Sequence, residues 1–221
     1  ARPLQETMLA VETRRRRAAK HWRSELRNDI LTAAMRPEHV IPRPAKVRPI
    51  PGVFAPGDGM KVVCGQGCEP AGRWLGPRLP TAAALEVRSV GEAAMQENAI
   101  LVEAAPAMTG EAYRLSVLPT GVRLSGAPAG LFRGAATLGQ LLADERGGPA
   151  GSVPCCEIED EPAFAWRGLL LDCSRHFLSM AWLVRALDVM AGLKLNRLHL
   201  HLVDDQGWRM EIASRPKLAS V

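Results

Sequence analysis

The spacing of apolar and polar positions indicates a regular α+β pattern in the middle of the chain. Residues 61–64 and 99–104 are apolar runs of strand length, and residues 111–125 alternate with period 2 around a Pro-Thr-Gly turn, which predicts a β-hairpin. Residues 129–143 place apolar side chains on one stripe at helical spacing. We therefore expect a small α+β domain over residues 48–150.

The pattern changes after a stretch rich in Gly, Pro and acids at residues 151–162, which we interpret as a domain junction. Residues 167–172 form a nearly continuous apolar run, typical of a parallel strand buried on both faces. Residues 180–192 have apolar positions at helical spacing, and residues 198–203 form a second apolar run. Strand, helix and strand together predict one β-α-β unit with a right-handed crossover.

The first 47 residues differ in composition from the rest. Residues 1–48 hold 12 of the 28 Lys and Arg residues but only 5 of the 23 Asp and Glu residues, so the excess positive charge is N-terminal. Residues 5–35 have loose helical periodicity, and six prolines between residues 37 and 56 indicate a linker. Because charge runs are usually solvated, we expect no nucleic-acid partner, although contact with an anionic surface stays open.

Composition excludes some classes of protein. The chain has 221 residues, of which 47% are hydrophobic, but its apolar runs are far shorter than the roughly 20 residues that cross a bilayer. The chain starts with Ala, and its first twenty residues lack the apolar stretch of a secretory signal, so we expect a trimmed chain or a fragment. The five cysteines leave open whether Cys64 pairs with Cys68, or Cys155 with Cys156.

Polar side chains follow both predicted strands of the β-α-β unit. Asp172 and Arg175 come at the end of the first strand, and Asp204 and Asp205 at the end of the second. In βα-repeat folds the functional groups lie at this edge, and Arg donors with carboxylate acceptors suit a polyhydroxylated ligand. The simpler alternative is that Asp172 and Arg175 form only a salt bridge and that Asp204 caps a turn.

Two histidines in the second strand provide a different hypothesis. His199 and His201 are two residues apart, so both side chains point to the same face of the strand. This pattern is also typical of zinc sites on barrel strands. A metal-dependent (β/α)8-barrel hydrolase is therefore one alternative, and a non-catalytic protein that binds carbohydrate or an anionic surface is another.

Several motifs in this region resemble family 20 β-N-acetylhexosaminidases. They are RGLLLDCSRHF from Arg167, KLNR from Lys194, HLHLVDDQGWRMEI from His199 and RPKL from Arg215. Upstream, EAYRL, GLFRGAATLGQLL and IEDEP resemble the family's non-catalytic α+β domain. The resemblance implies that this α+β domain is followed by the start of a (β/α)8 barrel, with residues 163–221 supplying the first β-α-β.

The resemblance also assigns roles to single residues. Arg175 matches the arginine that hydrogen-bonds ring hydroxyls of the terminal sugar, and Asp204, with Asp205 as second choice, matches an aspartate that supports the catalytic acid. Two departures from the family pattern are Leu200 in place of Trp and Cys173 in place of Val or Thr. The residues expected to hold this edge in place are Asp172, His199 and His201. No metal or other cofactor is implied.

The implied reaction is the substrate-assisted, retaining hydrolysis of terminal N-acetylglucosaminides or N-acetylgalactosaminides. The family's adjacent Asp-Glu pair is expected beyond residue 221, because the acidic triplet at residues 159–161 precedes the first barrel strand. A full barrel takes roughly 250 residues, so residues 163–221 encode at most a quarter of one. We expect these 221 residues alone to be inactive, with exposed apolar faces. Secreted, periplasmic and lysosomal locations all fit, and the oligomeric state stays open.

Overall fold

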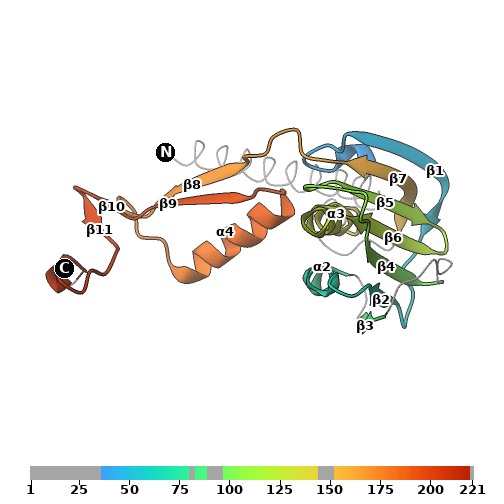
Figure 1. The fold of residues 1–221 in the computed structure, drawn as a ribbon, viewed down its shortest axis with the longest axis horizontal. Coiled ribbons are helices and arrows are strands. Elements are labelled where there is room, and N and C mark those ends of the chain that lie inside the picture. Colours follow the sequence, from blue (N-terminus) through green and yellow to red (C-terminus); the bar gives the residue numbers. More distant parts are fainter. Residues whose placement is uncertain (1–35, 80–82, 89–96, 144–151, 220–221) are drawn as a thin grey trace, which may run out of the picture.

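The computed structural model describes residues 36–79, 83–88, 97–143 and 152–219. The helix expected over residues 5–35 and most of the basic segment lie outside these ranges. The described residues form two units, a sheet domain (residues 36–161) and a β-α-β unit (residues 163–219), which extends away from it (Figure 1).

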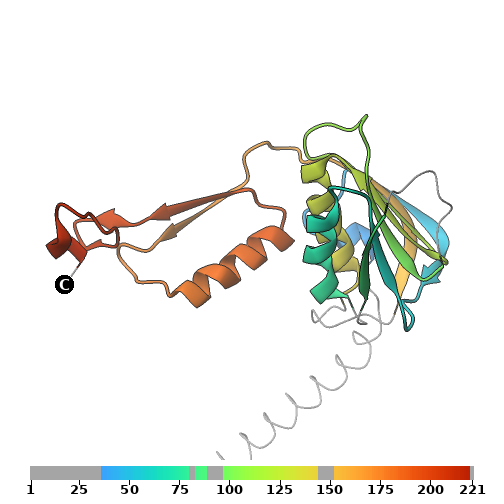
Figure 2. The same ribbon diagram turned by 60° about the horizontal axis from the view of Figure 1, so that its bottom comes forward.

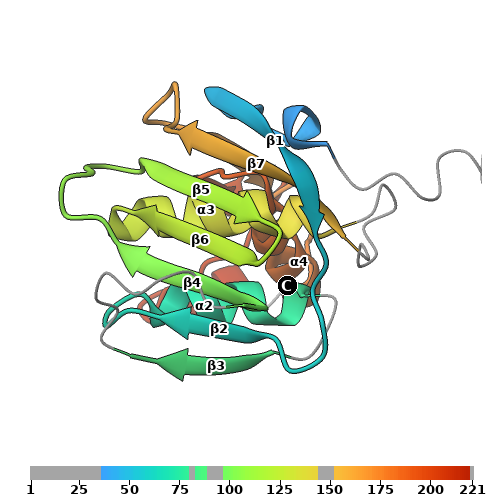
Figure 3. The same cartoon turned by 90° about the vertical axis from the view of Figure 1, so that its right-hand side faces the viewer.

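A seven-stranded mixed sheet forms the sheet domain, with the spatial order β1-β7-β5-β6-β4-β2-β3 (Figure 3). Strands β6, β4, β2 and β3 run parallel to one another, whereas the pairs β1–β7, β7–β5 and β5–β6 are antiparallel. The strand bounds are β1 Lys46–Phe54, β2 Lys61–Cys64, β3 Ala84–Val87, β4 Ala99–Ala104, β5 Tyr113–Leu118, β6 Gly121–Gly126 and β7 Val153–Asp160. The predicted strands at 61–64 and 99–104 and the predicted hairpin are confirmed.

Two helices, α2 (Glu69–Leu75) and α3 (Pro128–Leu141), cover the face of the sheet that is turned toward the β-α-β unit (Figure 2). Short 3-10 turns, η1 (Pro37–His39) and η2 (Gly76–Arg78), complete this domain. Alternate residues of β5 are buried, as its period-2 pattern requires. The core therefore lies between the helices and one face of the sheet, as the apolar stripe of α3 predicts.

Both predicted boundaries of this domain are wrong. The segment 151–162, interpreted as a junction, contains β7, which lies inside the sheet between β1 and β5. At the other end, β1 begins at Lys46 and Val40 is buried in the core, so residues 37–47 are part of the fold rather than a linker. Glu157 and Glu159 made the segment look like a loop, but they alternate with the buried Cys156 and Ile158.

The β-α-β unit has the predicted elements. Strand β8 (Gly168–Asp172), helix α4 (Met180–Gly192) and strand β9 (Arg197–His201) follow one another, and the two strands pair in parallel from Gly168↔Arg197 to Asp172↔His201. The hydroxyl of Ser179 caps α4 by accepting from the Trp182 N–H. A two-strand hairpin, β10 (Val203–Asp204) with β11 (Gly207–Trp208), and the 3-10 turn η3 (Pro216–Ala219) end the described chain.

One expectation for β8 is wrong, because the strand is not buried on both faces. Leu171 is 9% exposed, whereas Leu170, on the opposite face, is 55% exposed. The expectation of exposed apolar faces in this unit is thereby confirmed.

Two further features bear on the sequence-based expectations. Among the described residues, no helix is both long and apolar enough to cross a bilayer. All five cysteines are buried as free thiols, and burial raises the pKa of Cys64 to about 11 and that of Cys156 to about 12. At neutral pH these two side chains are therefore protonated thiols with little nucleophilic character.

Candidate functional site

The carboxyl ends of β8 and β9 lie at the end of the β-α-β unit that is far from the sheet domain (Figure 1). Asp172, the last residue of β8, shapes the turn that follows it. Its Oδ1 accepts from the backbone N–H of Arg175 at 3.0 Å, and its Oδ2 accepts from Nη1 of the same residue at 2.5 Å. The main chain and side chain of Arg175 are thus fixed by one carboxylate.

Asp204 fixes the other side of the Arg175 guanidinium. Arg175 Nη2 donates to Asp204 Oδ2 at 2.9 Å, so the guanidinium bridges the turns after both strands. The hydrogen bonds from the Arg175 N–H and guanidinium lower the pKa of Asp172, while contact with Asp172 and Asp204 raises the pKa of Arg175. Half of the Arg175 side chain stays exposed to solvent.

Asp204 is the most heavily contacted carboxylate of this group. Its Oδ1 accepts from the Asp205 N–H at 2.8 Å, and its Oδ2 lies 2.9 Å from Nε2 of His201 as well as from Arg175. These hydrogen bonds, with that of the Asp205 N–H the largest, lower the pKa of Asp204 to about 2. Because an ionised carboxylate only accepts, the ring hydrogen of neutral His201 must lie on Nε2, which leaves Nδ1 as an acceptor.

Residues that the sequence pattern did not indicate fix, through hydrogen bonds, the turns that carry Arg175 and Asp204. The backbone N–H groups of Cys173 and Ser174 both donate to the carbonyl of His201 at 3.0 Å, and the fully buried Ser174 hydroxyl donates to the carbonyl of Gly207 at 2.7 Å. Arg209 Nε donates to the carbonyl of Cys173 at 3.2 Å. The signal for these contacts was slight, because backbone acceptors leave no trace in a sequence pattern.

The structure brings together five of the six residues that the sequence singled out. We call four of them the rim cluster: Asp172, Arg175, His201 and Asp204. Asp205 contributes its backbone N–H. The sixth, His199, lies two residues before His201 on the same face of β9. Its side chain is exposed and lines an open hollow of about 570 Å³ formed by residues of both strands.

Both simpler alternatives for the rim cluster are partly realised. Asp172 and Arg175 do form an ion pair, and Asp204 does accept from the next backbone N–H, but the same contacts hold a half-exposed guanidinium in one place. For the metal hypothesis, the described residues contain no group of three or more His, Cys, Asp or Glu side chains arranged to hold an ion. His201 instead contacts Asp204.

Comparison with protein families places both units. The model of glycosyl hydrolase family 20, domain 2, matches residues 38–161, more than half of the chain, and the model of the catalytic domain of the same family matches residues 164–221. The chain belongs to glycosyl hydrolase family 20. The resemblance seen in the sequence is thus confirmed: the sheet domain is the family's domain 2, and the β-α-β unit is the start of its catalytic barrel.

Individual family 20 proteins agree with this assignment. A β-hexosaminidase of Akkermansia muciniphila is 49% identical over 117 residues, which cover 52% of this chain and 24% of that protein. A β-hexosaminidase of Porphyromonas gingivalis is 36% identical over 193 residues, covering 83% of this chain and 25% of that protein. The chain therefore spans about a quarter of the length of these relatives.

Solved structures show the same arrangement. A family 20 exo-β-N-acetylglucosaminidase of Vibrio harveyi, in complex with N-acetylglucosamine, superposes with a TM-score of 0.71 at 30% identity, covering 86% of this chain and 29% of that one. The family 20 β-N-acetylhexosaminidase of Streptomyces coelicolor gives the same TM-score at 36% identity, covering 84% and 39%. These values extend over both units, so family 20 accounts for the fold of nearly all described residues.

Proposed function

We propose that this protein is a β-N-acetylhexosaminidase, which releases terminal non-reducing N-acetylglucosamine or N-acetylgalactosamine residues from glycans. The retaining reaction uses the 2-acetamido group of the substrate as the nucleophile. The names of the relatives and of the solved structures support this proposal. The observation that carries it is the Arg175 guanidinium held between Asp172 and Asp204 with half of its side chain open to solvent.

Arg175 has the donors that a sugar ring requires. A guanidinium carries five N–H donors, and the two contacts with carboxylates occupy one N–H on Nη1 and one on Nη2. Three donors remain for neighbouring ring hydroxyls, and the two carboxylates prevent the side chain from rotating away. Binding therefore costs little side-chain entropy, because the guanidinium is already fixed in place.

Asp204 is proposed to act as a support for the catalytic acid rather than as the acid itself. With a pKa of about 2 it is ionised at neutral pH and has no proton to donate. A fixed negative charge at this edge disfavours ionisation of a nearby carboxylic acid and so helps to keep that acid protonated. His201 holds the Asp204 carboxylate in place from behind through Nε2.

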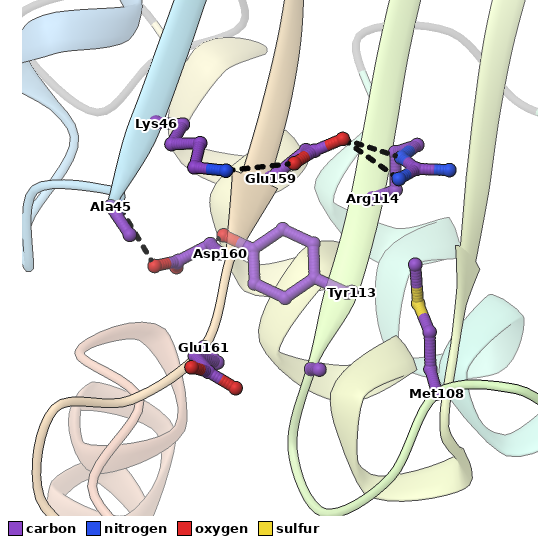
Figure 4. A pocket seen from close by; sticks show the side chains of 9 residues that line it. Ala45, Lys46, Met108, Tyr113, Arg114, Glu159, Asp160 and Glu161 are labelled. Carbon is purple, nitrogen blue, oxygen red and sulfur yellow. Dashed lines mark hydrogen bonds and ion pairs between the residues drawn. The ribbon is translucent and has the colours of Figure 1, made fainter.

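The acidic triplet at residues 159–161 does not supply a catalytic pair. Figure 4 shows Glu159 between Lys46 and Arg114 on the surface of the sheet domain, with Asp160 beside Tyr113. Both carboxylates are engaged by these side chains, and they lie on β7 rather than at the barrel edge. We therefore propose that residues 1–221 alone do not cleave the glycosidic bond.

Hydrolysis of nitrophenyl N-acetyl-β-glucosaminide and galactosaminide by two polypeptides tests the proposal. The product of the complete reading frame is expected to release nitrophenol, and a polypeptide of residues 1–221 to stay at the blank rate. In the active protein, Arg175→Met should lower kcat/KM on the order of 100-fold, because charged hydrogen bonds to the sugar are lost. Arg185→Met, which removes an exposed arginine of α4, serves as the control.

Two results would contradict this proposal. One is release of nitrophenol by residues 1–221 above the blank. The other is a folded full-length product that cleaves neither substrate, or whose Arg175→Met variant matches the Arg185→Met control.

A further inference from the structure

The loop between α4 and β9 contacts the sheet domain through Lys194, a residue with an unusual backbone conformation. Lys194 follows the C-cap of α4 with a φ of +61°, in the left-handed region that glycine usually occupies at this position. The Leu195 N–H donates to the Met190 carbonyl at 2.8 Å and closes the end of the helix. A lysine in this left-handed conformation strains the backbone. We therefore expect contacts of the Lys194 side chain to offset this strain.

The Lys194 side chain is 4% exposed and ends inside the sheet domain. Its Nζ donates to Asp160 Oδ2 and to the Tyr113 hydroxyl, both at 2.9 Å. The Tyr113 hydroxyl donates to Asp160 at 2.7 Å and lies 2.6 Å from the Thr137 hydroxyl, and Figure 4 shows Asp160 also reaching the backbone of Ala45. A buried ammonium is tolerated only with such partners, so this contact fixes Lys194 in a single position.

A second pair of contacts surrounds the first. Glu111 accepts from Arg133 Nη2 at 2.7 Å and from the Arg167 guanidinium, and all three side chains are largely buried. The contact between the two units thus holds three cations, Lys194, Arg133 and Arg167, against the carboxylates of Asp160 and Glu111. Burial lowers the pKa of Lys194, and Arg133 and Arg167 lower it further, whereas Asp160 raises it. Asp160 is therefore the group that keeps the ammonium charged.

The same loop fixes where both barrel strands begin. Arg167, directly before β8, donates from Nε to the Lys194 carbonyl at 2.8 Å and from its backbone N–H to the Asn196 side chain at 3.0 Å. The backbone N–H of Asn196 donates to the Arg167 carbonyl at 2.9 Å. From this point the strands pair in register as far as Asp172 and His201. A slip by one residue would turn the rim side chains to the opposite face.

We infer that Lys194 is a positioning residue, whose ammonium, held by Asp160 and Tyr113 of domain 2, determines where β8 and β9 start and thereby where the rim cluster lies. The sheet domain, which is domain 2 of the family, then positions the rim cluster of the barrel, although no residue of the rim cluster belongs to it. What the rim cluster does in catalysis rests on the proposed function. Where it lies does not, so the two ideas are tested by separate measurements.

Titration of the Asp204 carboxyl by carbon NMR in the 221-residue chain measures the position of the rim without an activity assay. Lys194→Met removes the ammonium and keeps most of the stem, and Lys194→Gly removes the side chain while relieving the left-handed backbone. In both folded variants the pKa of Asp204 is expected to rise above about 2, because Arg175, which follows β8, moves away from the Asp204 carboxylate when the start of β8 shifts. Lys46→Gln is the control, since it breaks the exposed Lys46–Glu159 pair of the same sheet.

A pKa of Asp204 that stays at about 2 in either folded variant overturns the inference. So does an equal rise in the Lys46→Gln control, which would indicate a general loosening of the sheet. If both Lys194 variants fail to fold, Tyr113→Phe gives the decision, because it removes only the hydroxyl, with its contacts to Lys194, Asp160 and Thr137, and keeps the ammonium and the ring. The pKa of Asp204 must then rise in that variant, and an unchanged pKa overturns the inference.

Discussion

At the scale of single residues, the rim cluster couples charge to stability through Asp204. Its pKa lies at about 2, below the ordinary value of 3.8, because the folded protein provides donors that the unfolded chain lacks. A carboxyl whose pKa falls on folding stabilises the folded state at neutral pH. The contribution is complete above the unfolded pKa and is lost as the pH falls through the folded one.

Asp204→Asn should therefore flatten the dependence of the free energy of unfolding on pH between about 4 and about 2. Urea unfolding at a series of pH values measures this slope. Asp205→Asn is the comparison variant, because it keeps the Asp205 backbone N–H, which makes the strongest of the hydrogen bonds to Asp204. Equal slopes for Asp204→Asn and the unchanged chain would contradict the geometry described for Asp204.

Much of the rim cluster was predictable from the sequence, and the contact of Lys194 with the sheet domain was not. Asp172, Arg175, His201 and Asp204 lie at or just after the ends of two apolar strands, and parallel strands bring their carboxyl ends to one edge whatever the rest of the fold does. Lys194 gave no such signal. A lysine after a helix reads as a solvated C-terminal charge, and its partner Asp160 is 34 residues away in another unit.

At the scale of elements, α3 packs unusually close to β5 and β6. A Cβ added at Gly130 would overlap the backbone carbonyl of Ala112, whereas one added at Gly139 of the same helix would meet nothing nearer than 3.8 Å. Helix and sheet can approach this closely only where the helix has no side chain. The two glycines should therefore respond to the same substitution with opposite signs.

Gly130→Ala is expected to lower the free energy of unfolding by about 1–3 kcal/mol or more, because the carbonyl that it meets belongs to the backbone and cannot rotate away. Gly139→Ala should raise it by up to about 1 kcal/mol through the higher helix propensity of alanine. Chemical denaturation of both variants provides the comparison. Equal effects of the two substitutions would be inconsistent with the described approach of α3 to the sheet.

The error over β7 shows how composition can mask an element. Gly, Pro and acids around residues 151–162 indicated a junction, but the acids at 157 and 159 point to solvent from a strand whose alternate residues are buried. Two of these acids are paired with arginines on neighbouring strands, Arg48 with Glu157 and Arg114 with Glu159. Pairs of this kind depend on long-range register, which period-2 counting in one segment does not show.

Ile158→Ala tests this interior strand. The side chain is fully buried, so its loss should cost about 2–5 kcal/mol of unfolding free energy. Glu157→Ala, at the adjacent, partly exposed position, should cost less than about 1 kcal/mol, since surface ion pairs contribute little. If residues 151–162 were only a connection, both variants would unfold at the same denaturant concentration as the parent.

At the scale of the whole molecule, apolar surface is distributed unevenly. The sheet domain buries most of its large apolar side chains in one core, whereas the β-α-β unit leaves many of its own exposed on both sides of α4 and on β8. Its exposed large apolar residues are Phe164, Trp166, Leu170, Phe177, Met180, Trp182, Val184, Leu187, Val189, Leu193, Met210 and Leu218. Among the described strands, β8 and β9 pair only with each other, so each has an open edge.

These exposed faces should make the 221-residue chain associate with itself. Apolar patches of this extent are uncommon on monomers, and removing them from water stabilises any contact between copies. Sedimentation velocity of residues 1–221 is expected to show larger species as concentration rises, while residues 36–161 alone stay monomeric.

Charged substitutions identify the surface responsible for this association. The double variant Val184→Glu with Val189→Glu replaces two exposed valines of α4 by carboxylates and should shift the distribution toward monomer. Val53→Glu, at a valine of similar exposure on β1 of the sheet domain, is the matched control and should leave the distribution unchanged. Both valines of α4 are about half exposed, so the fold itself should tolerate the substitutions. If association persists in the α4 variant but disappears in the Val53 variant, the contact between copies lies on the sheet domain. The open face of the β-α-β unit would then not be the surface through which the copies associate.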